Sequence, residues 1–223
     1  WYNVGSGLND RVFDVAVVGE NVYMGGMFTN AGGLDAADAV VRWDGDEWYA
    51  LGSGLNAGVS IIEVAGPDVY VGGGFTENGS GEDLYRIARW DTTELNPVWN
   101  ALGDGVNDVV VAISVAGSDV YVGGWFTDTA GIANADHIAH WDGDAWHALG
   151  TGLNSAVGAI EVVGSDIYAS GAFTDAGGDP DADYIARWDG AAWHALGSGV
   201  NGDVYATEVI GPDVYVGGAF ADA

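Results

Sequence analysis

The chain has 223 residues, no cysteine, and 33 acidic side chains against five basic ones, for a formal net charge of −28. This charge argues against nucleic acid and anionic membranes as partners, because both are bound through cationic contacts to phosphate. Without cysteine, neither a disulfide framework nor a zinc–thiolate site is available. No apolar run approaches the roughly 20 residues needed to cross a bilayer, so no membrane insertion is predicted within this segment.

One sequence motif recurs along the chain. The pattern W-x-A-L-G-x-G-[LV]-N occurs four times, and the variant WYNVGSGLN opens the sequence. Repeats therefore start near positions 1, 48, 99, 146 and 193, at intervals of 47 residues except for one interval of 51. The longer interval has its extra residues between Trp90 and Trp99, in DTTELNPV, where other repeats have a short turn such as DGDE. An insertion confined to one turn leaves the surrounding elements intact.

Each repeat contains four short segments typical of β-strands. In the third full repeat they are Val109–Ala116, Val120–Phe126, His137–Trp141 and Trp146–Leu149. These segments are rich in Val, Ile, Tyr and Trp, and they are separated by turns such as AGSD and WDGD. Four antiparallel strands in a repeat of this length predict a β-propeller blade.

The number of blades follows from the phase of the repeats. The chain opens on an outer-strand phrase, contains five inner strands and ends after the second strand of the fifth repeat. The sequence thus predicts an all-β, five-bladed β-propeller of four-stranded antiparallel blades over residues 1–223, with the last repeat incomplete. Pairing of the strand at Trp1 with the last blade would close the ring and protect its sheet edges. The alternative is a fragment of a larger propeller.

The repeat consensus also resembles known families. The pattern VYVGGxFT…AxxIARWDGxxWxALGxGxN, which covers essentially the whole chain, resembles the kelch-like propeller repeats of bacterial secreted and surface proteins. It is also similar to the repeats of fungal cortical polarity-marker proteins. The resemblance implies the fold strongly and a function only weakly, because propellers serve binding, scaffolding and catalysis alike.

Catalytic motifs are missing from the sequence. It has no nucleophile elbow, phosphate loop or dinucleotide fingerprint, and its four histidines show no metal-ligand spacing. Five-bladed glycosidases use clustered carboxylates, and two acids at a suitable separation could serve here. The blades of such enzymes are usually irregular, however, whereas this chain repeats itself closely. The sequence therefore predicts that the protein is not an enzyme.

Regular repeats and an acidic surface without lysine favour a non-catalytic, extracellular or cell-surface propeller that acts as a structural or protein-interaction module. Two alternatives stay open. One is a carbohydrate-binding lectin with near-equivalent sites between blades, and the other is a glycoside-active enzyme. The expected partner is a protein or a glycan at the cell surface, and association into a homo-oligomer or a larger assembly is also open.

Charged residues recur at fixed places on the inner and third strands. Glu63 lies on an inner strand and Arg89 precedes the third-strand Trp of the same repeat; Glu161 and Arg187 have the same spacing. Because a guanidinium group can bind a carboxylate through two parallel hydrogen bonds, the pattern predicts a structural ion pair in each of these blades. We expect each pair to reach across the second strand over its glycines. A cation-binding ring of acids is the alternative.

Trp125 is the main candidate for ligand binding. The other repeats carry Met, Gly or Ala at this position, so packing of the repeat does not require an indole there. The regularly repeated tryptophans are instead predicted to pack between neighbouring blades. The amides of Asn56, Asn107 and Asn154, which end the glycine-rich loops, are further candidate ligand groups, although such amides commonly bond to nearby backbone.

The loops between the second and third strands carry many acids. Asp179, Asp181 and Asp183 alternate along one loop in a way that could hold a hard cation such as calcium through oxygen ligands. The run lacks the full calcium-loop pattern, and a solvated acidic loop is the competing interpretation. The sequence predicts no cofactor, with calcium left open as a ligand of this loop.

The excess of acids predicts that stability depends on salt. Folding crowds carboxylates that the unfolded chain can spread apart, and their repulsion is screened over about 10 Å at 0.1 M salt and about 3 Å at 1 M. The melting temperature should therefore rise as NaCl is added at constant pH. Specific calcium binding would instead give a rise that saturates at low millimolar calcium and that magnesium does not reproduce at equal ionic strength. A melting temperature indifferent to both salts would contradict both interpretations.

Overall fold

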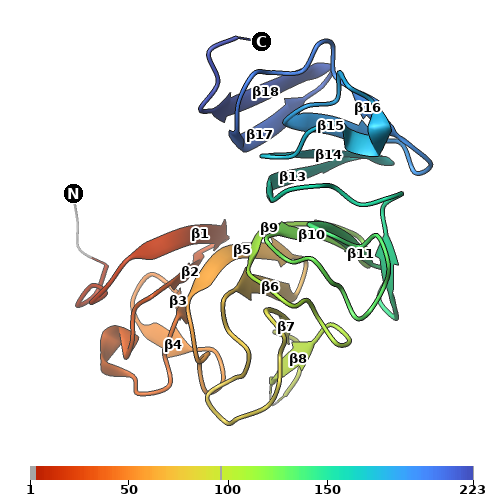
Figure 1. Cartoon of the computed structure of the whole chain (residues 1–223). Helices are drawn as coiled ribbons and strands as arrows, with labels where there is room; N and C mark the ends of the chain where they lie inside the picture. Colours follow the sequence, from red (N-terminus) through yellow and green to blue (C-terminus); the bar gives the residue numbers. More distant parts are fainter. Residues whose placement is uncertain (1–3, 96, 223) are drawn as a thin grey trace. The chain divides into compact units, whose positions relative to one another are not determined.

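The computed structural model describes residues 4–95 and 97–222, and the chain divides into two compact units, Trp1–Gly105 and Val106–Ala223. Nearly all regular structure in both units is β-sheet (Figure 1). The predicted strand at Trp1 begins outside the described residues.

The first unit contains two four-stranded antiparallel sheets, which we call blades 1 and 2. In each, the strands follow one another in chain order from the inner to the outer edge. Blade 1 consists of β1 (Val12–Val18), β2 (Asn21–Gly26), β3 (Val40–Trp43) and β4 (Trp48–Ala50), and blade 2 of β5 (Val59–Ala65), β6 (Asp68–Gly73), β7 (Ile87–Asp91) and β8 (Trp99–Ala101).

The second unit continues the same pattern in blades 3, 4 and 5. Among the described residues, blade 5 has two strands. Blade 3 consists of β9 (Val110–Ala116), β10 (Asp119–Gly124), β11 (Ile138–Trp141) and β12 (Trp146–Ala148); blade 4 of β13 (Val157–Val163), β14 (Asp166–Gly171), β15 (Ile185–Trp188) and β16 (Trp193–Ala195); blade 5 of β17 (Val204–Ile210) and β18 (Asp213–Gly218).

These sheets confirm the predicted all-β fold of repeated four-stranded blades, the last of them partial. The strand bounds in blade 3 agree with those predicted to within two residues. Helical structure is limited to two short 3-10 turns, η1 (Ala31–Gly33) and η2 (Ala176–Gly178), within the described ranges. No helix in the described part of the chain is long and apolar enough to cross a membrane. That residues 1–223 form one closed ring stays a prediction.

A β-bulge marks the same place in the first hairpin of every blade. In blade 1 the register shifts between Val12 and Asp14, so Phe13 is an additional residue on the inner strand. The second glycine of the Gly pair faces this bulge, and a Cβ atom at Gly26 would run into the carbonyl oxygen of Arg11. The same conflict would arise at Gly73, Gly124, Gly171 and Gly218.

In blades 1 and 3 the first glycine of the pair makes room for the next blade. A Cβ atom at Gly25 would lie 2.5 Å from Cγ1 of Val59 and 3.0 Å from Cδ1 of Ile62, both on the inner strand of blade 2. Gly123 stands in the same relation to the inner strand of blade 4. The buried aliphatic side chains of each unit therefore gather between blades, and this is where its hydrophobic core lies.

The repeated tryptophans close the outer part of each blade. The rings of Trp43 and Trp48 are cross-strand partners with centroids 4.9 Å apart, and the pairs in blades 2, 3 and 4 have centroids 5.2 to 5.5 Å apart. Trp99 Nε1 also donates a hydrogen bond to the carbonyl oxygen of Leu51 in the preceding blade, at 3.0 Å. The predicted packing between blades is thus confirmed, and the structure adds an indole pair within each of blades 1 to 4.

The interface between blades 4 and 5 does not use the glycine–aliphatic contact seen between other blades. In blade 4, Ser170 replaces the first glycine, and on the next inner strand Thr207 replaces the isoleucine found at positions 62 and 160. The two hydroxyl oxygens lie 2.6 Å apart, and Ser170 is fully buried. A polar contact has therefore replaced an apolar one at the same place.

This pair generates a stability prediction. Thr207→Ile should lower the free energy of unfolding by about 1–3 kcal/mol, because it crowds Ser170 and leaves a buried hydroxyl without its partner. Adding Ser170→Gly should recover most of that loss, since the double variant restores the glycine–isoleucine contact of the other blades. Urea denaturation of the parent, the single variant and the double variant measures both steps. A double variant no more stable than the single one would contradict this explanation.

Candidate functional site

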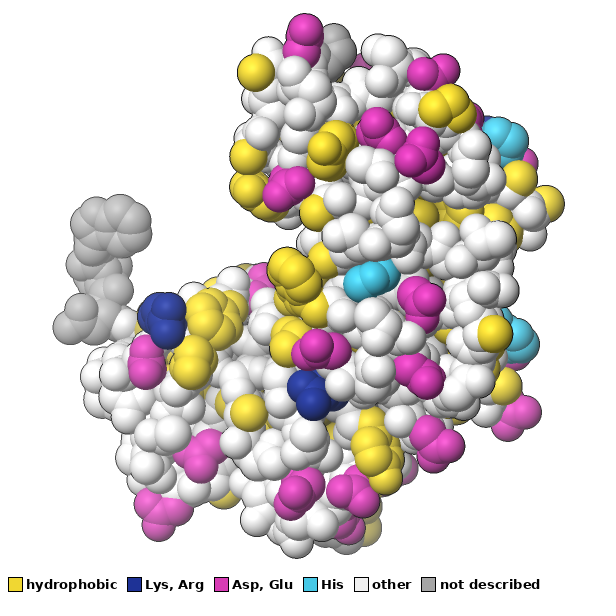
Figure 2. Space-filling view, in the orientation of Figure 1, with side chains coloured by type: hydrophobic (Ala, Val, Ile, Leu, Met, Phe, Trp, Pro, Cys, Tyr) yellow, Lys and Arg dark blue, Asp and Glu magenta, His cyan; other side chains and the backbone are white. Residues whose placement is uncertain are grey.

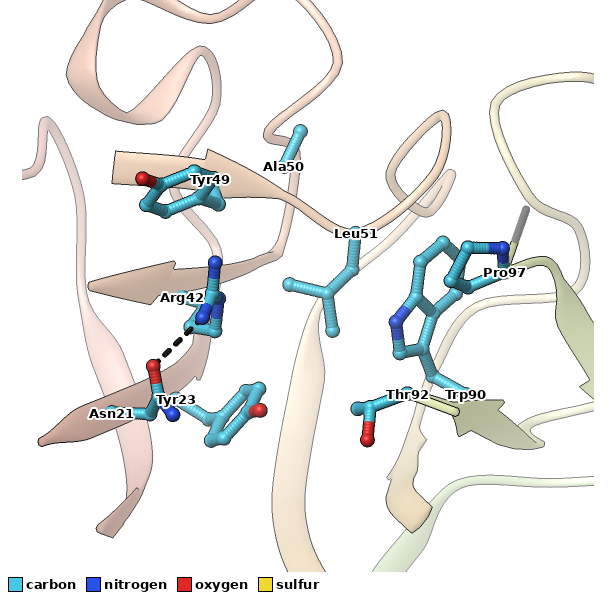
Figure 3. Close-up of a pocket in the computed structure, with 9 residues that line it drawn as sticks. All are labelled: Asn21, Tyr23, Arg42, Tyr49, Ala50, Leu51, Trp90, Thr92 and Pro97. Atoms are coloured by element: carbon cyan, nitrogen blue, oxygen red, sulfur yellow. Dashed lines mark hydrogen bonds between the residues drawn. The ribbon is translucent and has the colours of Figure 1, made fainter. Parts of the chain in front are cut away.

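A pocket of about 430 Å³ lies between blades 1 and 2 of the first unit (Figure 3). Strands β2 to β4 and the residue that follows them provide one side, and the outer part of blade 2 provides the other. Its lining residues are Asn21, Tyr23, Arg42, Tyr49, Ala50, Leu51, Trp90, Thr92 and Pro97.

Three of these side chains form one row across blade 1. Tyr23 pairs with Arg42, and Arg42 with Tyr49, so the three side chains share one face of the sheet. The Arg42 guanidinium lies 4.2 Å from the centre of the Tyr49 ring, within the range of a cation–π interaction. Burial raises the pKa of Tyr23, and the positive charge of Arg42 opposes that rise.

The hydrogen-bond partner of Arg42 distinguishes this blade from the others. Arg42 Nη1 donates to Asn21 Oδ1 at 2.8 Å, and the two groups face each other in Figure 3. Among the described residues, no carboxylate lies within 4 Å of the Arg42 guanidinium nitrogens. Asp44 is close enough for the two charges to interact, but its Oδ1 is occupied by the amides of Asp46 and Glu47. The positive charge of Arg42 is therefore paired with a neutral amide.

Blades 2 and 4 place an acid at the position of Asn21. Arg187 Nη1 donates to Asp166 Oδ2 at 2.8 Å, and Arg89 Nη1 lies 3.5 Å from Asp68 Oδ2. Blade 3 repeats the arrangement with His140 Nε2, which lies 2.6 Å from an oxygen of its own second-strand aspartate. The Asn at position 21, where the other repeats have Asp, is a sequence signal for this pocket that the predicted site residues do not include.

These contacts differ from the predicted ion pairs. Arg187, expected to meet Glu161, contacts Asp166, the first residue of its second strand. Arg89 likewise contacts Asp68, and its expected pairing with Glu63 stays a prediction. The register explains the difference. Tyr168 stands between Glu161 and Arg187 in their row, whereas an acid two residues before the tyrosine lies on the same face within reach. Burial and the charge of Glu208 raise the pKa of Glu161.

The loop asparagines hold the second strand of their own blade. Asn56 Oδ1 accepts hydrogen bonds from the amides of Thr76 and Glu77, at 2.9 and 3.2 Å, and its Nδ2 donates to the Thr76 hydroxyl at 2.9 Å. Asn107 and Asn154 make the same contacts with the corresponding threonines of blades 3 and 4. These amides, predicted as ligand groups, are thus engaged in structural hydrogen bonds.

Trp125 belongs to a second candidate surface, which we call the bulge edge. It consists of the bulge residue of each inner strand and the residue after each Gly pair. In the second unit, Trp125 and Tyr205 are 59% and 64% exposed there, and in the first unit Phe13 and Met27 are each 47% exposed. Figure 2 shows hydrophobic side chains at the surface between scattered acidic ones. The full set is Phe13, Ser60, Val111, Gly158 and Tyr205, with Met27, Gly74, Trp125, Ala172 and Ala219.

A basic side chain joins this edge in blade 1. Arg11 Nη2 lies 3.6 Å from the Met27 sulfur, and its guanidinium lies 5.5 Å from the centre of the Phe13 ring. Blades 2 and 4 carry only small residues at both places of the bulge edge. These are Ser60 and Gly74 in blade 2, and Gly158 and Ala172 in blade 4. Large and small residues therefore alternate from blade to blade along this edge.

Two of the three aspartates predicted as metal ligands accept hydrogen bonds from amides of their own loop. Asp183 Oδ1 accepts the amide of Asp175, and Asp179 Oδ1 accepts the amide of Asp181, so two of the carboxylates shape their own loop. Blade 1 has the same loop contact between Asp38 and the amide of residue 30. Within the described ranges, no three acidic or histidine side chains gather in a way that could hold a metal ion.

Histidine–aspartate pairs occur at the outer turns. His147 Nε2 lies 2.7 Å from Asp142 Oδ2, and His194 stands in the same relation to Asp189. Amide hydrogen bonds from the turn, and then the histidine, hold the pKa of Asp142 well below its usual range. In blade 1, Tyr49 takes the histidine position and hydrogen-bonds to the equivalent aspartate. The repetition of this contact marks it as part of the turn.

Comparisons with known proteins bear on the fold. No protein-family model matches the chain, and no curated protein matches it. Among solved structures it is similar to the computationally designed Ika4 protein, with 14% identity and a TM-score of 0.52 over 82% of this chain and 93% of that one. The designed Ika8 protein has 16% identity and a TM-score of 0.47, over 92% of this chain and 67% of that one. A chain of the mitotic checkpoint complex has 14% identity and a TM-score of 0.44, over 88% and 69%.

The fold and the likeness to the Ika4 protein define this chain as a propeller-like repeat protein. At 14% identity the likeness concerns the fold alone. The other two structures are too distant to add to it.

The asparagine contacts generate a second stability prediction. Asn56→Ala removes two accepted hydrogen bonds and one donated bond at once, so it should lower the free energy of unfolding by about 1–3 kcal/mol. Asn100→Ala is the matched control, because Asn100 makes one side-chain hydrogen bond to the carbonyl of Val98. Urea denaturation compares the two variants. If Asn56→Ala were as stable as the control, the structural role given to this amide would be wrong.

Proposed function

We propose that this propeller is a non-catalytic interaction module of the cell surface or extracellular space, and that it binds a protein partner through the bulge edge. The observation that carries the proposal is the exposure of Trp125 in blade 3 and Tyr205 in blade 5, at equivalent edges of the two blades that flank blade 4. Inner strand β13 of blade 4 packs against β9 and β17 on either side, so the small residues of blade 4 lie between these two aromatic positions.

The chemistry of the edge suits protein recognition. Tryptophan, tyrosine and arginine are the residue types that contribute most to protein–protein binding, and they do so when they enter a pocket and lose water. Packing within the repeat does not need them, because other blades fold with Gly or Ala in the same places. Their presence in blades 1, 3 and 5 therefore favours a role outside the fold. The acidic surface around them would select a partner with complementary charge.

The non-catalytic and extracellular parts of the proposal have separate support. Each histidine–aspartate contact of the outer turns recurs in equivalent blades, which favours a structural role. The similarity of the consensus to kelch-like repeats of secreted and surface proteins favours the location. Near-equivalent lectin sites between blades are less well supported, because the other repeats have Asp where blade 1 has Asn21, and blade 3 has His140 where blade 1 has Arg42.

Affinity capture tests the proposal. The immobilised chain is exposed to surface and secreted extracts of its source, beside a Trp125→Ala/Tyr205→Ala variant and a Leu95→Ala control. Leu95 is 96% exposed but lies outside the bulge edge, in the insertion of blade 2. We expect the double variant to keep its melting temperature and to recover a partner about tenfold less well or worse, while the control matches the parent.

Equal recovery by the parent and the double variant would contradict binding at the bulge edge. Hydrolysis of any member of a polysaccharide panel by the parent would contradict the non-catalytic part of the proposal. A glycan array separates the lectin alternative, which requires several similar sites on each chain.

A further inference from the structure

The pocket between blades 1 and 2 combines two departures from the repeat. Asn21 replaces an aspartate on one side, and the insertion between Trp90 and Trp99 supplies Thr92 and Pro97 on the other. Neither departure is needed for a blade to fold, because blades 3 and 4 form without them. Two unrelated changes that meet in one cavity point to a role for the cavity itself.

The charge of the pocket is opposite to that of the protein. The chain carries a net charge of −28, and the third-strand arginines of blades 2 and 4 face an aspartate of their own blade. Arg42 faces Asn21 instead, and its Nη1 donates a hydrogen bond to the amide oxygen of Asn21. A ligand carboxylate can take the remaining donors of the guanidinium without displacing a protein acid.

We propose that this pocket binds a small ligand that carries a carboxylate, with a body about the size of a monosaccharide or a disaccharide. Arg42 binds the carboxylate, and Asn21 contributes its Nδ2 group, which makes no hydrogen bond to any described residue. The volume of about 430 Å³ lies within the range of small-molecule sites. This site is independent of the protein interaction at the bulge edge.

The walls of the pocket explain the size and kind of the ligand body. Tyr23 and Tyr49 flank Arg42 on one side, Trp90 lies on the opposite side, and Leu51 lies between them (Figure 3). Aromatic and aliphatic walls around one cation favour a carboxylate attached to a ring or a short chain over a fully hydrated inorganic anion. The charge of Asp44 near Arg42 opposes ligands with more than one negative group at the same end.

Calorimetric titration tests the proposal with three probes at fixed ionic strength and pH 7. Glucuronate supplies the carboxylate on a sugar ring, glutarate supplies it on a short chain, and glucose supplies the ring without the charge. We expect saturable binding of at least one of the two carboxylates and no saturable binding of glucose. The better of the two carboxylates identifies the source of the ligand as a sugar acid or an aliphatic acid.

Three variants locate the site. Asn21→Asp introduces the aspartate that blades 2 and 4 carry beside their arginines, so it should keep the fold and weaken carboxylate binding about tenfold or more. Arg42→Gln should weaken binding to a similar degree. Arg187→Gln is the matched control, because it removes the equivalent arginine of blade 4, and it should leave binding unchanged.

The proposal is overturned if neither carboxylate binds, or if glucose binds as tightly as glucuronate. It is also overturned if Asn21→Asp binds the carboxylate as the parent does while its melting temperature is unchanged. Because the bulge edge is untouched in all three variants, capture of a protein partner should be the same as for the parent. Failure of the carboxylate site and failure of the protein-binding site are therefore distinguishable.

Discussion

The close approach of one blade to the next, over a glycine of the second strand, is the contact on which the structure depends. At Gly25 and Gly123 a side chain would occupy the space that a valine and an isoleucine of the following inner strand fill. A four-stranded blade is too thin to bury apolar surface by itself, so its stability comes from this interdigitation with its neighbours. Ser170 and Thr207 show that the contact tolerates a change when both partners change together.

Because the blades depend on contacts that repeat, surface side chains fall into two groups. Some make contacts that recur in several blades, and the others depart from the repeat. The loop asparagines, the paired tryptophans and the outer-turn aspartates are engaged in contacts that recur in several blades. The two binding roles that we propose therefore rest on residues that break the pattern. Asn21 with Arg42 and the aromatic residues of the bulge edge are such positions, and both sets lie where neighbouring blades meet or strands end.

The third-strand arginines show the same division between structural and open positions. Arg89 and Arg187 each meet an aspartate of their own blade, and these partly exposed pairs hold the second and third strands in register more than they stabilise the fold. Arg42 sits at the same position but meets an amide. One change from carboxylate to amide thus turns a structural ion pair into an available cation, on a protein whose surface otherwise repels anions.

The sequence by itself determined the repeat and the four strands of a blade, with bounds correct to within two residues in blade 3. A period of 47 residues and alternating apolar side chains are local properties that do not depend on distant contacts. It also marked Trp125 as unnecessary for packing. It did not choose correctly between two acids for Arg187, because Glu161 and Asp166 lie on one face of the blade and only the position of Tyr168 between the strands separates them. The pocket at Arg42 required the tertiary structure, since its walls come from two repeats and its volume depends on how closely their blades pack.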